Sequence, residues 1–377
     1  MNKFTTSIII GGVVLSIYSA SAPADIILLA KDPKRDALSA PLSFKISGSI
    51  RPEWSFNNDN SSDYHTGHDG GSRFRFTTDY ALSQHTSVVG YYEVGVDMAH
   101  LLHMNGHYDK HHNATNQRQL YAGFSDDRYG RFTLGHQYGV YYSVIAGKSD
   151  IWDNDAQAVG DGVGVGSNYD GSSRPKRSLK YTNVFGPVTL YADYLLPQDK
   201  YPLSSGFYYR RTRGGGLGLD YKINQDLTLG LAYNLTAATI SNMANRSKKY
   251  HQQLSGAAFT WTPNNWYVAG TASYYKDFVP SKRQRRVSKY FAGSGYGIEG
   301  FVGYTVNIDK PYLKFIQPYV AADSLRLKGD EDYHASHTYV GVDATVGYGF
   351  SIYVERTFAT KNDRTPDQTF VTLFYDF

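Results

Sequence analysis

The residues with the most obvious capacity for chemistry are four histidines in one short stretch, His103, His107, His111 and His112. A cluster of imidazole side chains is able to bind zinc or copper. The spacing of these four follows neither the period of a helix nor that of a strand, so nothing holds them on one face. We therefore predict a loop here, and we predict that the protein uses no metal and no cofactor.

Hydrolytic catalysis would need a Ser or Asp beside a His, with a third polar group to orient the imidazole. His136 and His251 fall in predicted strands, and neither has a serine partner on its own face of the strand. The chain has no cysteine, which rules out a disulfide framework and a thiolate metal site. We predict that the protein is not an enzyme.

Charged residues instead recur at every second position. From residue 73 to residue 79, Arg73, Arg75 and Asp79 alternate with Phe74 and Phe76. This period of two gives a strand one polar and one apolar face. Similar alternation continues to the C-terminus without a helical pattern, in segments of about ten residues.

We count 16 such strands. They start near Leu42, Ser72, Ser87, Asn116, Arg131, Lys176, Val188, Gly214, Leu227, His251, Asn265, Ser294, Lys314, Ser336, Phe350 and Asp367. The strand near Lys314 is the least regular, because Pro311 and Pro318 flank it.

Very short turns and long polar loops join these strands alternately. The predicted turns are 82–86, 126–130, 185–187, 224–226, 262–264 and 347–349. The predicted loops are 57–71, 98–115, 138–175, 197–213, 237–250, 277–293 and 324–335. Short connections on one side and long ones on the other are typical of an outer-membrane β-barrel.

Both the start of the chain and its composition fit export. Residues 1–24 have a Lys near the start, a short apolar run and small residues after it, so we predict a signal peptide with Asp25 as the first mature residue. No later stretch has the 18 apolar residues of a membrane-spanning helix. The rest, 25–377, is predicted to be one barrel domain.

Membrane energetics orient the side chains. An arginine on the lipid face at mid-depth costs roughly 2–4 kcal/mol, so Arg73, Arg75, Glu93, Asp97 and Asp220 are predicted to face the lumen. Tyrosine is abundant, with 34 residues. The tyrosines predicted to form interfacial girdles are Tyr80, Tyr91, Tyr92, Tyr181, Tyr194, Tyr221 and Tyr233.

The connection between the strands near Arg131 and Lys176 is about 37 residues rich in Gly, Asp and Asn. Ordered connections are far shorter, so a segment of this length is either disordered or functional. Our hypothesis is that it folds inward and narrows a pore.

The ordered set of motifs resembles the general porins of the enterobacterial outer membrane, which are non-specific and trimeric. The likeness covers the mature chain and is strongest in RFRFTTDYALSQHTSVVGYYEVGVD (73–97), RQLYAGF and YGRFTLGHQYGVYY (118–142), and the terminal FVTLFYDF. The resemblance implies a 16-stranded antiparallel transmembrane β-barrel, all-β, with an inward-folded third loop.

The resemblance also implies a charged constriction. Arg73, Arg118 and Arg174 match a basic cluster on the barrel wall of the family. The family's first-strand lysine falls at Ser49, and Arg51 on the same face is the expected substitute.

The acidic side departs from the family pattern. Glu93 and Tyr138 also match family positions, but the third loop reads KSDIWDNDAQAVGDG where the family has a Pro-Glu-Phe-Gly-Gly turn. Asp150, Asp153 and Asp155 are the loop candidates for the acidic side.

We therefore expect a passive channel in the outer membrane of a Gram-negative bacterium. Carboxylates on the loop and guanidinium groups on the wall would set up a transverse field, and ions and small hydrophilic solutes would pass. The alternative is a substrate-specific channel, which becomes credible if Tyr141, Tyr142, Trp152 and Tyr169 all line the bore. A non-conducting surface scaffold or adhesin is a third reading.

Several partners follow from the same reasoning. The resemblance implies a homotrimer latched by the His-rich second loop, and it makes Phe377 a signal for the barrel-assembly machinery. The SKRQRR stretch at 281–286 is expected to contact lipopolysaccharide and outer-membrane lipid, and no nucleic acid.

Overall fold

The computed structural model describes residues 25–29, 41–57, 65–103, 113–154, 157–159, 163–203, 206–282, 286–360 and 367–377. The predicted signal peptide, most of the His-rich stretch and Asp155 lie outside these residues. No helix in the described ranges is long and apolar enough to cross a membrane.

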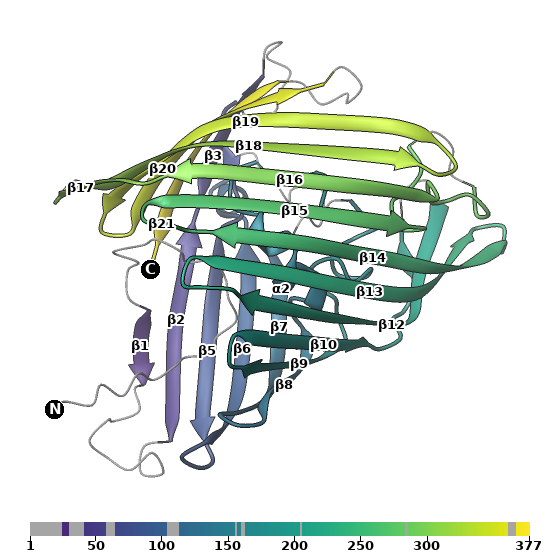
Figure 1. Ribbon diagram of the computed structural model, residues 1–377, viewed down its shortest axis with the longest axis horizontal. Helices are drawn as coiled ribbons and strands as arrows, with labels where there is room; N and C mark the ends of the chain where they lie inside the picture. Colours follow the sequence, from purple (N-terminus) through teal and green to yellow (C-terminus); the bar gives the residue numbers. More distant parts are fainter. Residues whose placement is uncertain are drawn as a thin grey trace.

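In the described part of the chain, sixteen antiparallel strands close into a barrel (Figure 1). In chain order they are β2 (Leu42–Ile50) continued by β3 (Pro52–Asn57), β5 (Arg73–Ala81), β6 (Thr86–Val96), β7 (Thr115–Asp126), β8 (Gly130–His136), β9 (Ser178–Phe185), β10 (Val188–Leu195), β12 (Phe207–Lys222), β13 (Leu227–Asn242), β14 (Ser247–Trp261), β15 (Trp266–Lys276), β16 (Ser294–Tyr304), β18 (Leu313–Lys328), β19 (Asp332–Gly347), β20 (Phe350–Ala359) and β21 (Gln368–Asp376).

Short elements accompany the barrel. They are the strands β1 (Ile26–Leu29), β4 (His68–Asp69), β11 (Tyr201–Pro202) and β17 (Val306–Lys310), the helices α1 (Met98–Leu101) and α2 (Val140–Val144), and the 3₁₀ turn η2 (Ala146–Lys148). Asp97 caps α1 by accepting the N–H of His100 at 2.8 Å. None of these elements was predicted, because each is too short to show a period.

The last strand closes the barrel against the first. β21 pairs with β3 along Gln368 to Thr372 and with β2 at Ile50 and Ser49. Beyond that, Gly48 and Phe377 exchange two backbone hydrogen bonds of 2.8 and 3.1 Å. Closure supplies each barrel strand with two neighbours, as a strand in lipid requires.

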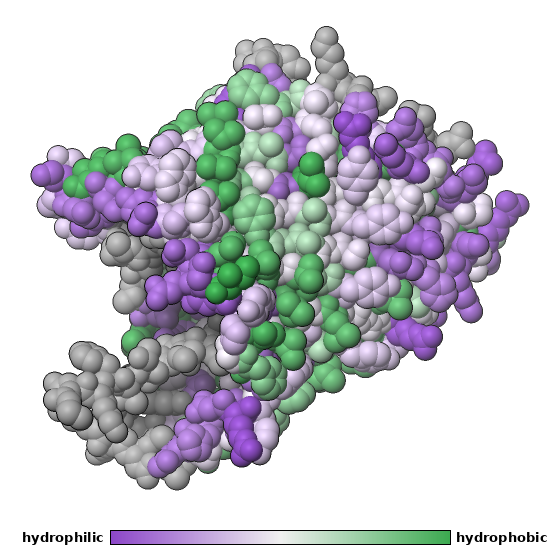
Figure 2. Space-filling model, in the orientation of Figure 1, coloured by the Kyte–Doolittle hydropathy of each residue, from purple (hydrophilic) through white to green (hydrophobic). Residues whose placement is uncertain are grey.

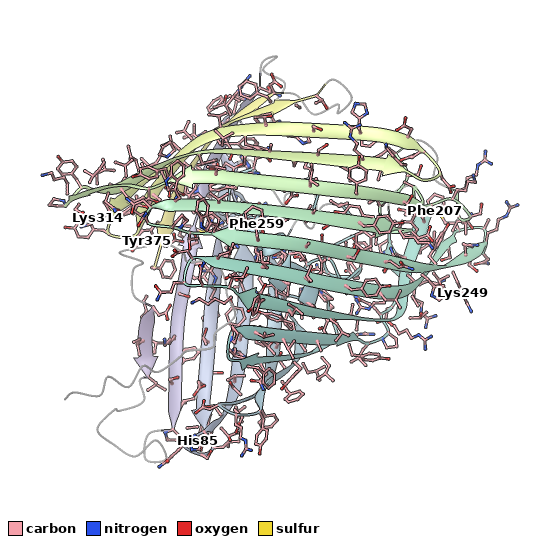
Figure 3. The ribbon with its side chains drawn as sticks, viewed as in Figure 1. His85, Phe207, Lys249, Phe259, Lys314 and Tyr375 are labelled. Carbon is pink, nitrogen blue, oxygen red and sulfur yellow. The ribbon has the colours of Figure 1, made fainter. Side chains whose placement is uncertain are left out.

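The predicted alternation of faces is confirmed. In β13 the side chains of Leu229, Leu231 and Leu235 are exposed, while those of Ala232 and Asn234 are buried. In Figure 2 a hydrophobic band crosses the strands and is flanked by hydrophilic ends. Figure 3 places Phe207 and Lys249 at one of these ends and Lys314 and Tyr375 at the other.

The predicted short turns are confirmed, but three of the predicted loops are wrong. β12 to β14 and the hairpin of β18 and β19 run through most of residues 207–213, 237–250 and 324–335. Buried Tyr209, Ile240 and Tyr250 pack together at the loop end of these strands. The side chains that alternate with them point outward and are mostly polar, so the sequence there has the composition of a loop.

Two smaller predictions also need correction. Pro318 lies within β18, opposite Val342 of β19, instead of flanking the strand. Tyr91 donates its hydroxyl hydrogen to Glu93 at 2.9 Å, so it shares the face of Glu93 and is not part of a lipid-facing girdle.

Candidate pore constriction

The connection 137–177 between β8 and β9 begins with α2, which packs against β12 and β13 (Figure 1). Its contact depends on glycine. A Cβ on Gly218 would lie 2.7 Å from the Val140 side chain, and one on Gly230 would lie 2.7 Å from the Val144 carbonyl oxygen. Larger residues would therefore push α2 away from these strands.

Strand side chains hold the start of the connection. Asp193 of β10 accepts the N–H of Val140 at 2.9 Å. Lys148, at the end of η2, donates to Asp220 of β12 at 2.6 Å. Tyr141 is fully buried, and its hydroxyl group contacts Ser273 of β15.

Three carboxylates hold the middle of the connection. Glu299 of β16 accepts the Ser149 hydroxyl at 2.6 Å and the N–H of Val159 and Ala158 at 2.5 and 3.2 Å. These contacts bind a segment that has no regular structure of its own. Buried N–H groups need such acceptors, and charged acceptors make the strongest hydrogen bonds.

The other two carboxylates lie further around the same wall. Asp323 of β18 accepts the N–H of Gln157 at 3.0 Å. Glu355 of β20 accepts the N–H groups of Asp153 and Asn154, both at 3.1 Å. All three carboxylates are buried. In each of these strands the carboxylate lies on the less exposed face, and the side chains on the opposite face are more exposed. The connection is thus attached to the less exposed face of this wall.

An arginine cluster lies on the wall of β5 to β7. Glu93 accepts from Arg118 Nε at 2.7 Å and from Arg75 Nε at 3.1 Å. Arg73 Nε donates to the Gly71 carbonyl at 3.0 Å, and its charged neighbours include Arg51 and Arg118. The structure therefore brings three of the four predicted arginines together. Glu93 lies among them on the wall and not on the loop.

Arg51 belongs to this cluster, whereas Arg174 lies on the connection 137–177. Arg51 donates from Nε to Ser49 Oγ at 2.8 Å and lies 4.4 Å above the ring of Phe374. Arg174, near the end of the connection, lies 5.8 Å above the ring of Tyr138 at its start.

Of the three loop aspartates predicted for the acidic side, the two that the structure describes differ in their contacts. Asp150 accepts the hydroxyl hydrogen of Tyr142, within the same connection. Asp153 accepts from Thr372 Oγ1 at 2.7 Å and has Arg51 among its charged neighbours. Burial, and next the nearby carboxylate of Glu53, raise the pKa of Asp153 to about 7. Its charge therefore changes near neutral pH.

Sequence reasoning did not find the carboxylates that hold the connection. Glu299, Asp323 and Glu355 each lie on the polar face of an alternating strand, the same pattern that assigned Arg73 and Glu93 to one face of their strands. The residues of the connection that they bind have no period, so the pairing was not predictable. No group of His, Cys, Asp or Glu suited to a metal ion occurs among the residues that the structure describes.

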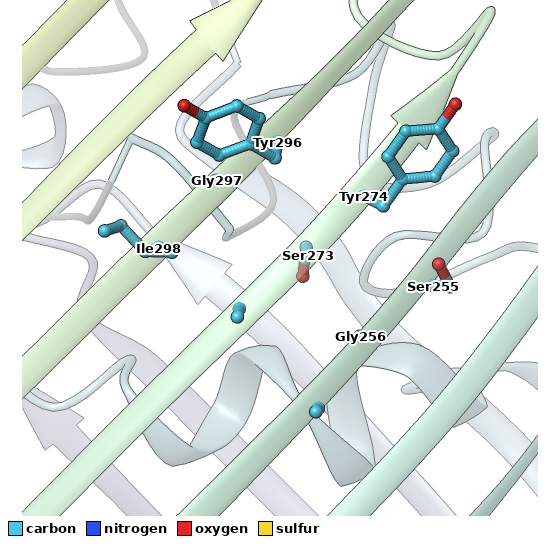
Figure 4. Close-up of a pocket in the computed structure, with 9 residues that line it drawn as sticks. Ser255, Gly256, Ser273, Tyr274, Tyr296, Gly297 and Ile298 are labelled. Atoms are coloured by element: carbon cyan, nitrogen blue, oxygen red, sulfur yellow. The ribbon is translucent and has the colours of Figure 1, made fainter.

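The outer side of the same wall carries a shallow groove of ≈ 390 Å³ (Figure 4). Small residues of β14 and β15 form its floor, including Ser255, Ala257 and Ala272. Half-exposed Tyr274 and Tyr296 lie along it.

Comparison with known proteins identifies the family of this barrel and solved structures that resemble it. The profile of the Gram-negative porin family matches residues 11–377. No curated protein sequence matches the chain. Among solved structures, OmpF of Salmonella typhi is similar at a TM-score of 0.67 and 16% identity, covering 89% of this chain and 98% of its own.

Two further structures share the fold. OmpT of Vibrio cholerae in its trimer form has a TM-score of 0.57 and 13% identity, covering 89% of this chain and 100% of its own. The anion-selective porin of Comamonas acidovorans has a TM-score of 0.60 and 13% identity, with coverage of 89% and 100%. The chain belongs to the Gram-negative porin family and is a multi-pass β-barrel of the outer membrane that forms a passive channel.

Proposed function

We propose that the connection 137–177 lies inside the bore and narrows a water-filled passage for ions and small hydrophilic solutes. One observation carries the proposal. Glu299, Asp323 and Glu355, on the buried face of three strands, accept backbone N–H groups of the connection. In a closed barrel whose outer face is apolar, the buried polar face surrounds the lumen.

We further propose that opposite charges flank the passage. The basic side comprises Arg51, Arg73, Arg118 and Arg174. The acidic residues of the constriction are Asp150, Asp153 and Asp155 on the opposite side and Glu93, which lies among the arginines. Guanidinium groups keep their charge at any relevant pH, so the basic side is constant. Solutes would be oriented by the field between the two sides and excluded by size. No chemical reaction is required, which also argues against an enzyme.

The contacts favour a general channel over a sugar-specific one. A sugar-specific bore would need exposed aromatic rings along the path of the solute. Tyr141 and Trp152, within the connection, are buried against the barrel wall, and Tyr142 and Tyr169 are half-buried. A row of four exposed rings is therefore not available.

We propose a homotrimer, in which the short-stranded wall of β5 to β8 meets its neighbours. Its outward side chains are apolar and aromatic, among them Phe76, Tyr92 and Phe124, and Phe76 stacks on Tyr92 at 6.0 Å. The trimer form of the Vibrio cholerae OmpT supports this assembly. The His-rich second loop would latch onto a neighbouring subunit.

We also propose contacts with anionic lipid such as lipopolysaccharide. Arg210, Lys249 and Arg326 are exposed near the loop end of the long strands, and exposed Lys276 lies two residues after Tyr274 in β15. Basic side chains above aromatic ones suit phosphate groups above acyl chains.

Two proposals concern biogenesis. Residues 1–24 are removed during export. Phe377, whose ring packs edge-on against Phe74 at 5.6 Å, also serves as the signal read by the barrel-assembly machinery.

Recording from the purified protein in planar bilayers tests the function. The expected result is large openings that occur in steps of three. Under a salt gradient, the sign of the reversal potential shows whether the basic or the acidic side has the greater effect on ion selectivity. An absence of openings would contradict the channel. Block by one sugar at low concentration would favour the substrate-specific alternative.

A further inference from the structure

Trp152, in the middle of the connection 137–177, inserts its ring into a pocket of aromatic side chains from the barrel strands. The side chain is 6% exposed. It stacks parallel to Phe301 of β16, at 6.3 Å and 5° between planes, and lies tilted against Tyr339 of β19 at 5.3 Å. Tyr267 and Tyr319 complete the cluster. Four neighbouring strands, all more than 100 residues away from Trp152 in the sequence, thus form one pocket for this side chain.

The pocket is connected to the carboxylates that bind the loop backbone. Tyr319 donates its hydroxyl hydrogen to Glu355 at 2.7 Å, and Tyr339 donates to Asp323 at 2.7 Å. Glu355 in turn accepts from Asp153 and Asn154, which directly follow Trp152. The rings around Trp152 therefore orient the groups that hold the next residues of the loop.

The attachment of Trp152 itself is apolar. Its buried indole N–H has no hydrogen-bond partner within the described residues. Aromatic rings at these separations attract one another and bury large areas. Stacking and burial hold the side chain, so another flat ring of similar size should serve nearly as well.

We propose that Trp152 is the positioning residue that fixes the width of the passage, by holding the tip of the connection against the wall of β15 to β19. The inference rests on the proposed function. The stretch KSDIWDNDAQAVGDG lacks the turn motif expected from the porin resemblance, and Trp152 provides a different means of fixing the segment. Asp153 and Asn154 reach Glu355 only while the ring occupies its pocket.

The test compares Trp152→Ala, Trp152→Phe and Trp266→Ala with the wild type. Trp266 is a half-exposed tryptophan at the start of β15, on the opposite face of the strand from buried Tyr267, so its replacement removes the same side chain from the outer surface of the barrel. The readouts are single-channel conductance in planar bilayers and the swelling rates of liposomes in sugars of increasing size. Heat-modifiable mobility on gels checks folding.

For Trp152→Ala we expect a higher conductance, several current levels in place of one, and a shift of the size cut-off to larger sugars. Trp152→Phe and Trp266→Ala should keep wild-type values. A purely structural role would reduce the yield of folded protein and leave the cut-off of the folded fraction unchanged.

An unchanged cut-off in folded Trp152→Ala would overturn the inference, whereas a wild-type protein that does not conduct would overturn the proposed function instead. If Trp152→Ala does not fold, Phe301→Ala removes the ring from the other side of the stack. That variant should also shift the cut-off to larger sugars, and a wild-type cut-off would again overturn the inference.

Discussion

The two walls of the barrel use the same alternating pattern for different purposes. On β5 to β7 the buried-face charges pair with one another, as Glu93 does with Arg75 and Arg118. On β16, β18 and β20 the corresponding carboxylates instead accept backbone N–H groups from the connection 137–177. The first arrangement keeps side-chain charge on the wall, while the second holds a long segment in place.

Strand length also differs around the barrel. β5 has 9 residues and β8 has 7, whereas β12, β13, β18 and β19 have 16 each. We call the wall of β12 to β19, which contains the 16-residue strands, the long wall, and the wall of β5 to β8 the short wall. The long wall extends past the apolar band and carries exposed basic residues there, such as Lys249 (Figure 3). The effect of removing a charged side chain should therefore depend on which wall carries it. The following predictions test this difference.

The largest effect is expected from Glu299→Ala on the long wall. The change leaves the buried N–H groups of Ala158 and Val159 without their acceptor, and each costs about 1–3 kcal/mol. We expect a loss of roughly 2–5 kcal/mol in the free energy of unfolding, together with noisy, multi-level openings. Denaturant unfolding in detergent and bilayer recording measure the two effects.

The matched control is Asp226→Ala, in the exposed turn between β12 and β13. It removes a carboxylate without touching the connection and should behave as wild type. Equal losses in the two variants would show that Glu299 has no special part in holding the connection.

A second pair of variants tests how closely the connection approaches the long wall. A Cβ on Gly297 of β16 would lie 1.9 Å from the Ala158 carbonyl oxygen, whereas the atom nearest to a Cβ on Gly300 would be 3.9 Å away. We expect Gly297→Ala to displace the connection and change the conductance, and Gly300→Ala to leave it unchanged. Identical conductance in both would mean that the segment does not pass beside Gly297.

On the short wall the expected change is in ion selectivity. Arg118→Gln removes one positive charge beside Glu93, and a charge about 4 Å from a passing ion contributes about 1 kcal/mol in water. We expect the permeability ratio to shift toward cations by up to about fivefold at low salt, because salt screens the effect.

Glu93→Gln should shift the ratio in the opposite direction, and Arg246→Gln, in an exposed hairpin, should leave it unchanged. The measurement is the reversal potential under a salt gradient. Shifts of the same sign from Arg118→Gln and Glu93→Gln would contradict a local electrostatic role.

The smallest effect expected is a pH dependence due to Asp153. Its pKa is raised to about 7, so the side chain is mostly neutral at pH 6 and mostly negative at pH 8. Cation preference should therefore rise as the pH rises across this range. Asp153→Asn should lose that part of the dependence. A variant whose pH profile matches the wild type would exclude Asp153 as its source.

Much of the fold was predictable because a period of two follows directly from the geometry of a strand in lipid. The same parity placed Arg73, Glu93 and Asp220 on the less exposed face. It failed for 237–250, where β13 and β14 leave the apolar band and their outward residues become polar. There a strand and a loop have similar compositions.

The path of the connection was not predictable, because its contacts join residues far apart in sequence. Val159 meets Glu299, and Asp153 meets Glu355, with no pattern in the connection to pair them. The glycines facing α2 were a usable signal. Gly216 and Gly218 alternate with leucine in β12, and an alternation of glycine with leucine indicates that something packs closely on the glycine face.

The most direct test of the account measures polymer exclusion from single channels, comparing the wild type with a variant in which 140–172 is replaced by a short Gly-Ser turn. The Gly139 N–H donates to the Ser173 carbonyl at 2.8 Å, so the cut ends are adjacent. If the connection narrows the bore, the wild type excludes polymers that enter the shortened variant, and the variant conducts more. Equal polymer cut-offs and equal conductance would contradict the claim that this segment sets the width of the channel.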